Sequence, residues 1–111
     1  FKQKTAYEIY QCDWSSDVCS SDLAAWRAAL DEALQAVAGF GATALVVPLG
    51  LDTYEGDPIS GFKLRSGDYP AIGAALAALG LPTVFTFEGG YAVAEVGVNA
   101  ANLLEGFERA A

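Results

Sequence analysis

Two short segments of the chain carry the side chains that could do chemistry. Asp52 follows Gly50 and Leu51 just past one β-branched run, and Tyr91 follows the pair Gly89-Gly90 after a second run. Zinc accepts Asp oxygen atoms as ligands, and a Tyr hydroxyl can donate a hydrogen bond to an oxyanion. The residue types therefore allow a metal ligand at Asp52 and an oxyanion-stabilising group at Tyr91.

Each of these residues also has a simpler structural interpretation. An Asp just past a strand often caps its own turn by accepting bonds from local N–H groups, and spacing alone favours this for Asp52. The ring of Tyr91 could pack on the following helix. Asp57-Pro58 is a turn signal, so Asp57 is expected to be structural. The Gly89-Gly90 turn could also cradle a phosphate, although it lacks the full dinucleotide fingerprint.

Helices and strands must alternate to position these residues. Trp26, Leu30, Leu34 and Val37 recur at spacings of four and three, which is the apolar stripe of a helix. Residues 44–48 form a β-branched run with no polar alternation, as in a strand that is buried on both faces, and residues 82–87 read as a second strand. The expected elements are a helix over residues 24–38, a strand over 44–48, a helix between 68 and 80, a strand over 82–87 and a helix over 94–109.

This order predicts an α/β fold in which helices cover both faces of a parallel sheet. Ligands bind beyond the carboxyl ends of the strands in such sheets, so the loops of Asp52 and Tyr91 should meet on one rim. Asp68 is expected to cap the second helix. The residues of the last helix that are expected to face the core are Val98, Ala101, Leu104 and Phe107.

The composition limits the possible functions. The chain has 111 residues, which allows one domain, and its 53% hydrophobic content excludes a disordered tail. A net charge of −8 leaves no basic surface for nucleic acid. The absence of His excludes Ser-His and Cys-His catalytic pairs within the chain. No apolar run reaches the roughly 18 residues that a membrane span needs.

Residues 1–23 differ in character from the rest of the chain. They show no helical or alternating apolar period, and they contain both cysteines, Cys12 and Cys19. Back-translation of residues 2–8 and 13–23 gives codons that match the two fixed parts of a common sequencing-library adapter. We therefore expect residues 1–23 to be a translated adapter, not a domain, fused to a truncated gene at Ala24. The two cysteines then carry no information about redox compartment or metal binding.

The remaining chain resembles a known family. The stretch from Leu49 to Ser60, LGLDTYEGDPIS, and the turn from Phe87 to Tyr91, FEGGY, are similar to the C-terminal part of acetylpolyamine amidohydrolases and histone deacetylase-like enzymes. The resemblance covers residues 24–111. It implies part of the three-layer, parallel-sheet arginase/deacetylase fold, truncated on its N-terminal side.

The resemblance also implies roles for particular residues. Asp52 matches the family's second aspartate ligand of zinc. Tyr91 matches the catalytic tyrosine that polarises the acetyl carbonyl, and Gly90 would shape the substrate channel beside it. Pro58 and Ile59 would line the acetyl pocket.

The implied parent enzyme is a zinc-dependent deacetylase that hydrolyses acetyl-amide bonds of acetylpolyamines or acetyl-lysine. Glu88 fits the polyamine-type pattern, which class II deacetylases share. The family's tandem His pair and Asp-x-His ligand motif are expected upstream of Ala24. We therefore expect this chain to be inactive, to bind zinc weakly at best, and to associate through exposed sheet and helix surfaces.

The resemblance further implies a cytoplasmic parent that could form a homodimer. Two alternatives remain open on the residues alone. One is a phosphate- or nucleotide-binding half-Rossmann module with its ligand at the Gly89-Gly90 turn. The other is a non-catalytic domain of the same fold.

Overall fold

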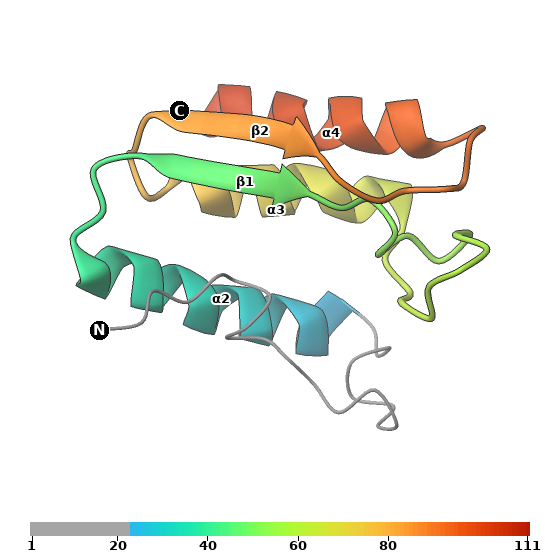
Figure 1. Cartoon of the computed structure of the whole chain (residues 1–111), viewed down its shortest axis with the longest axis horizontal. Coiled ribbons are helices and arrows are strands. Elements are labelled where there is room, and N and C mark those ends of the chain that lie inside the picture. The colour runs from blue at the N-terminus through green and yellow to red at the C-terminus, as the bar shows by residue number, and fades with distance from the viewer. Residues whose placement is uncertain (1–22) are drawn as a thin grey trace.

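The computed structural model describes residues 23–111, in which helices alternate with the strands of a parallel sheet (Figure 1). The order confirms the predicted α/β class. The expected adapter lies outside the described residues except for Leu23, which begins the first described helix. The elements are α2 (Leu23–Phe40), β1 (Leu45–Leu49), a 3₁₀ turn (Ser66–Asp68), α3 (Tyr69–Ala77), β2 (Thr83–Phe87) and α4 (Val96–Ala110).

Strands β1 and β2 pair in parallel, from Leu45 opposite Thr83 to Leu49 opposite Phe87. The pairing continues past the strand ends, because Glu88 N donates to the carbonyl of Leu49 at 3.0 Å. Both strands therefore deliver their following loops to the same rim, as predicted.

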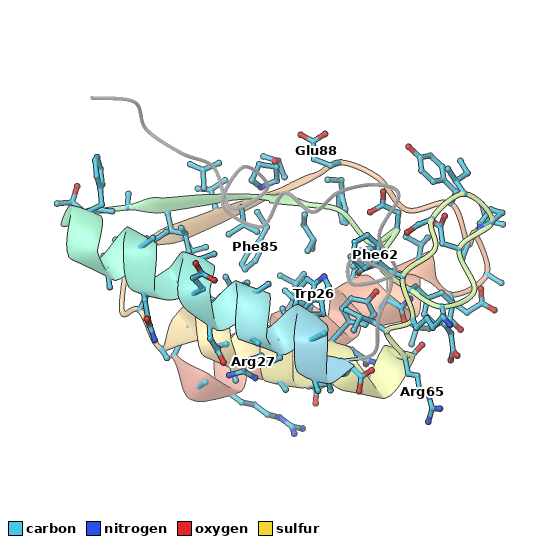
Figure 2. The ribbon with its side chains drawn as sticks, turned by 90° about the horizontal axis from the view of Figure 1, so that it is seen from below. Trp26, Arg27, Phe62, Arg65, Phe85 and Glu88 are labelled. Carbon is cyan, nitrogen blue, oxygen red and sulfur yellow. The ribbon has the colours of Figure 1, made fainter. Side chains whose placement is uncertain are left out.

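The helices cover one face of this sheet. Leu45, Val47 and Phe85 point into a core that apolar residues of α2, α3 and α4 complete. Val46 and Val84 alternate with them on the opposite face, where they are 63% and 58% exposed. Figure 2 shows the sheet with the helices on one side. Within residues 23–111 the expectation of two covered faces is wrong, since a right-handed crossover places α3 on one face only.

Helices α3 and α4 approach each other closely because small residues meet at their crossing. A Cβ on Gly73 would overlap the carbonyl oxygen of Leu103, and one on Gly106 would overlap that of Pro70. Packing beside this crossing includes an edge-on ring contact between Phe85 and Phe107, with centroids 5.3 Å apart.

The buried face of α4 differs from the expected one. Asn99, Ala100, Leu103 and Gly106 are buried, whereas Val98, Ala101 and Leu104 are exposed. The prediction is therefore wrong for those three residues and right only for Phe107, which packs against the core. Apolarity predicted the wrong stripe because the close approach to α3 requires a glycine, not a large side chain, at the contact.

The helix ends depend on glycine conformation. Gly41 (φ 80°) and Gly80 (φ 68°) follow α2 and α3 in the left-handed region that glycine tolerates. Asp68 precedes α3, but its carboxylate accepts the N–H of Arg65 at 2.8 Å and does not cap the helix as expected. No helix within residues 23–111 has the length and apolarity to cross a membrane.

Candidate active site

Asp52 lies in the loop that follows β1, beside the glycine turn that follows β2. A Cβ placed on Gly89 would lie 2.8 Å from Oδ2 of Asp52, and one on Gly50 would lie 2.9 Å from Oδ1. The carboxylate therefore occupies space that exists because these two positions lack side chains. Leu51 N, one residue before Asp52, donates to the carbonyl of Gly89 at 2.8 Å. The two loops are thus in direct contact at the rim.

The capping alternative for Asp52 has no support in this geometry. Among the hydrogen bonds of residues 23–111, none ends on the Asp52 carboxylate, whereas Asp57 accepts two from its own turn. The local cap of this loop is therefore Asp57. The Asp52 carboxylate is only partly buried and remains available to a ligand.

Thr53, the residue that follows Asp52, is held by the buried phenol of Tyr69. Oγ1 of Thr53 lies 2.9 Å from the hydroxyl of Tyr69, which is almost fully buried. The carbonyl of Thr53 also accepts the N–H of Leu64 at 3.1 Å. Burial raises the pKa of Tyr69 to about 12 against the lowering effect of the Thr53 hydrogen bond, and the negative charge of Asp52 adds to the increase. Tyr69 therefore stays protonated and can act as a fixed hydrogen-bonding group.

Tyr91 leaves the glycine turn with its ring at the surface. Gly90 has φ 135°, a conformation that L side chains rarely adopt, and Tyr91 is 50% exposed. This exposure argues against a ring that serves only to pack on α4. Tyr91 is thus a half-exposed residue in the loop that lies against the Asp52 loop.

The loop of Asp57 carries the remaining predicted site residues. Pro58 and Ile59 are exposed, and Ile59 is 74% exposed. Gly90 packs against the Asp52 loop, since a Cβ there would lie 3.1 Å from Cβ of Leu51. The structure thus brings all five predicted site residues into two adjoining loops, with Ile59 largely uncovered by the described part of the chain.

Asp57 links these two loops, which sequence reasoning did not foresee. Its Oδ2 accepts the N–H of Tyr91 at 2.8 Å, and its Oδ1 accepts those of Ile59 and Ser60 at 2.8 and 3.0 Å. Burial acts to raise the pKa of Asp57, but these three N–H groups outweigh it and hold the pKa below its ordinary value. The Asp-Pro turn signal indicated the local bonds, but no local pattern indicates the bond to Tyr91.

The described residues do not form a zinc site on their own. In residues 23–111, no group of three or more His, Cys, Asp or Glu side chains is placed to hold a metal ion. Catalytic zinc commonly has three protein ligands, and Asp52 supplies one carboxylate. A catalytic zinc ion at Asp52 would therefore need further ligands from outside residues 23–111.

Two other possible sites carry less weight. A phosphate at the glycine turn would need free N–H groups, but Asp57 already accepts that of Tyr91 and the Asp52 carboxylate lies against Gly89. A shallow groove of about 380 Å³ lies between α2 and the region of α3, and none of the predicted site residues lines it. Its lining residues are Arg27, Asp31, Leu34, Gln35, Ala38, Ala75, Ala78 and Leu79.

Comparisons with known proteins identify relatives of this chain. The acetylpolyamine amidohydrolase 1 of Pseudomonas aeruginosa is 56% identical over 86 residues, covering 78% of this chain and 25% of that protein. The acetylpolyamine amidohydrolase of Mycoplana ramosa is 53% identical over 81 residues, covering 73% of this chain and 24% of that protein. The chain thus spans about a quarter of the length of the curated relatives that it matches.

The fold is shared with a solved structure of the same kind. The crystal structure of acetylpolyamine aminohydrolase from Burkholderia pseudomallei matches with a TM-score of 0.79 at 35% identity, over 82% of this chain and 27% of that one. This similarity confirms the predicted arginase/deacetylase type of α/β fold. A family model, the histone deacetylase domain, matches residues 3–107. The chain therefore belongs to the histone deacetylase domain family.

Proposed function

We propose that this chain is the C-terminal part of a zinc-dependent amidohydrolase that hydrolyses acetyl-amide bonds. The observation that carries the proposal is the position of the Asp52 carboxylate against Gly89, two residues before Tyr91. Because of this contact, the loop of the candidate metal ligand Asp52 and the loop of the candidate oxyanion donor Tyr91 lie on the same rim of the sheet. Membership of the histone deacetylase domain family supports the same chemistry.

Each residue then has a separate task. Asp52 would supply one oxygen ligand to zinc, which when bound polarises the amide carbonyl and activates water. The Tyr91 hydroxyl would donate a hydrogen bond to the oxygen that becomes an oxyanion. Pro58 and Ile59 would flank the acetyl group, and Gly90 would leave room for the substrate beside Tyr91.

The favoured substrate is an acetylated polyamine, with acetyl-lysine as the alternative. Matched relatives bear the name acetylpolyamine amidohydrolase. Glu88 is exposed next to the glycine turn, and Figure 2 shows its side chain pointing away from the helices. Residues 24–111 carry 4 basic and 10 acidic side chains, and this net charge of −6 also favours the approach of a cationic amine. We expect the parent enzyme to act in the cytoplasm, and the resemblance allows a homodimer.

A chimera tests this proposal. The aligned 86 residues of the Pseudomonas aeruginosa enzyme are exchanged for those of this chain, and deacetylation of an acetylated polyamine is measured. We expect activity in the chimera, its loss with Asp52→Asn, and a decrease of about 10²–10³-fold in kcat with Tyr91→Phe. Glu55→Gln, an exposed carboxylate in the same loop, is the matched control. A folded chimera without activity, or an active Asp52→Asn variant, would contradict the proposal.

The 111-residue chain alone provides a second test. It is expected to show no deacetylation and to retain far less than one zinc ion per chain after dialysis, because one carboxylate is too few ligands for zinc. Zinc content is measured by elemental analysis. Stoichiometric zinc, or hydrolysis of an acetylated amine by this chain, would show that the expectation of inactivity is wrong.

A further inference from the structure

Asp57 is a buried charged residue outside the set of residues proposed to touch substrate or metal. It is 6% exposed and lies on the loop after β1. A carboxylate in such a place is unfavourable unless polar partners replace its water. Three backbone N–H groups do so, and hydrogen bonds to an ionised acceptor are stronger than neutral ones.

The two carboxylate oxygens hold different parts of the site. Oδ1 closes the turn by accepting the N–H groups of Ile59 and Ser60. Oδ2 accepts the N–H of Tyr91, which lies 34 positions away in the sequence. Gly90, with φ 135°, provides the backbone conformation that precedes this N–H. The single short side chain of Asp57 thus joins the backbone of Tyr91, the candidate oxyanion donor, to that of Ile59 in the candidate acetyl pocket.

We infer that Asp57 is a positioning residue that sets the place of Tyr91 relative to Ile59, an inference that rests on the proposed function of those two residues. A ring that is 50% exposed has few packing contacts to hold it, so its backbone attachment decides where the hydroxyl stands. Misplacement of a reacting group by about 1 Å lowers rates by about 10²-fold. Asp57 therefore acts on catalysis through Tyr91 without contact with the substrate.

Two substitutions separate the local role of Asp57 from the long-range one. Asp57→Asn replaces one of the two accepting carboxylate oxygens by an N–H₂ group, which cannot accept a hydrogen bond. On that side of the side chain, the N–H₂ group would face a backbone N–H group. Asp57→Ser retains a hydroxyl that can still close the local turn, but it is too short to reach Tyr91. Glu55→Gln is the matched control, because Glu55 is exposed in the same loop.

The first measurement is amide hydrogen exchange by NMR in the 111-residue chain. With Asp57→Ser, we expect the Tyr91 amide to exchange at least about 10-fold faster, while the Ile59 and Ser60 amides change less. The Leu45 amide, which donates to the carbonyl of Pro82 at 2.8 Å at the start of β1, is the internal reference within the same sample. Unchanged exchange at Tyr91 relative to Leu45 would overturn the inference.

The second measurement is steady-state kinetics in the chimera described above. We expect Asp57→Ser to lower kcat about 10²-fold with KM changed far less, and Glu55→Gln to leave both unchanged. If kcat stays unchanged while Tyr91 exchange accelerates, Asp57 is only structural and the inference is wrong. If the unsubstituted chimera is inactive, the proposed function fails, and the exchange experiment still decides whether Asp57 holds Tyr91.

Discussion

At the residue scale, the candidate site is built by side chains that hold its backbone. Asp57 fixes the Tyr91 turn, and Tyr69 fixes the residue after Asp52 through a 2.9 Å contact with Thr53. Buried polar groups of this kind must be paired, since an unpaired one destabilises the fold by about 1–3 kcal/mol. The site thus depends on two hydrogen bonds, Tyr91 N to Asp57 and Thr53 with Tyr69. The atoms that form these bonds touch neither metal nor substrate in the proposed mechanism.

The Tyr69 hydroxyl makes the stability of the folded chain depend on pH in the alkaline range. Its pKa is about 12 in the folded chain and about 10 when unfolded, so the folded state holds the proton more tightly. The contribution is complete below pH 10 and is lost as pH rises toward 12. The free energy of unfolding should therefore decrease as the pH rises across this window, and Tyr69→Phe should make that decrease smaller. Urea unfolding at several pH values measures it. An equal decrease in both proteins would contradict this assignment.

At the element scale, the crossing of α3 and α4 depends on two glycines. Gly73 and Gly106 allow backbone to meet backbone, and larger side chains on both sides then pack around the crossing. This contact also fixes the rotation of α4 about its axis. Because α4 begins shortly after Tyr91, its orientation sets the direction in which the chain leaves the glycine turn.

Substitution of Gly106 by Ala should destabilise the fold. The new Cβ would overlap the carbonyl of Pro70, and overpacking of this kind lowers stability by about 1–3 kcal/mol or more. Gly97→Ala is the matched control in the same helix, because no atom lies within 4 Å of its Cβ position. That variant should gain up to about 1 kcal/mol, since Ala favours a helix. Chemical denaturation of both variants measures the difference, and equal stabilities would show that the crossing is not tight.

At the scale of the whole molecule, no helix of residues 23–111 covers one face of the sheet. Val46 and Val84 are exposed there, and the outer side of α4 adds Val98 and Leu104. Apolar patches and open strand edges of this kind promote association between chains. The chain also spans about a quarter of its curated relatives, so its core is small for the surface that it exposes.

Association should therefore depend on the open face of the sheet. We expect the 111-residue chain to form oligomers whose size increases with concentration, measured by sedimentation velocity. Val46→Lys combined with Val84→Lys should reduce this association because charged side chains on the face repel a second copy. Gln35→Lys with Ala110→Lys adds the same charge at exposed positions elsewhere. Cooperative unfolding of a monomer at all concentrations in the unsubstituted chain would show that the open face does not drive association.

The sequence by itself determined the order of the elements and the rim on which the loops of Asp52 and Tyr91 meet. Helical stripes, apolar runs and glycine turns are local signals, and parallel pairing of neighbouring strands places both following loops together. Resemblance at the two loop motifs indicated the family that the domain comparison then confirmed. The roles of Asp52, Pro58, Ile59, Gly90 and Tyr91 remain proposals.

Only the tertiary structure decided which surfaces are buried and what holds the loops. The buried stripe of α4 follows from backbone contact at Gly106, which apolar periodicity does not register. The bonds from Tyr91 N to Asp57 and between Thr53 and Tyr69 join residues far apart in the chain. Such contacts depend on how whole elements dock against one another, so the residue types show what a loop could bind and the fold alone shows which contacts hold that loop in place.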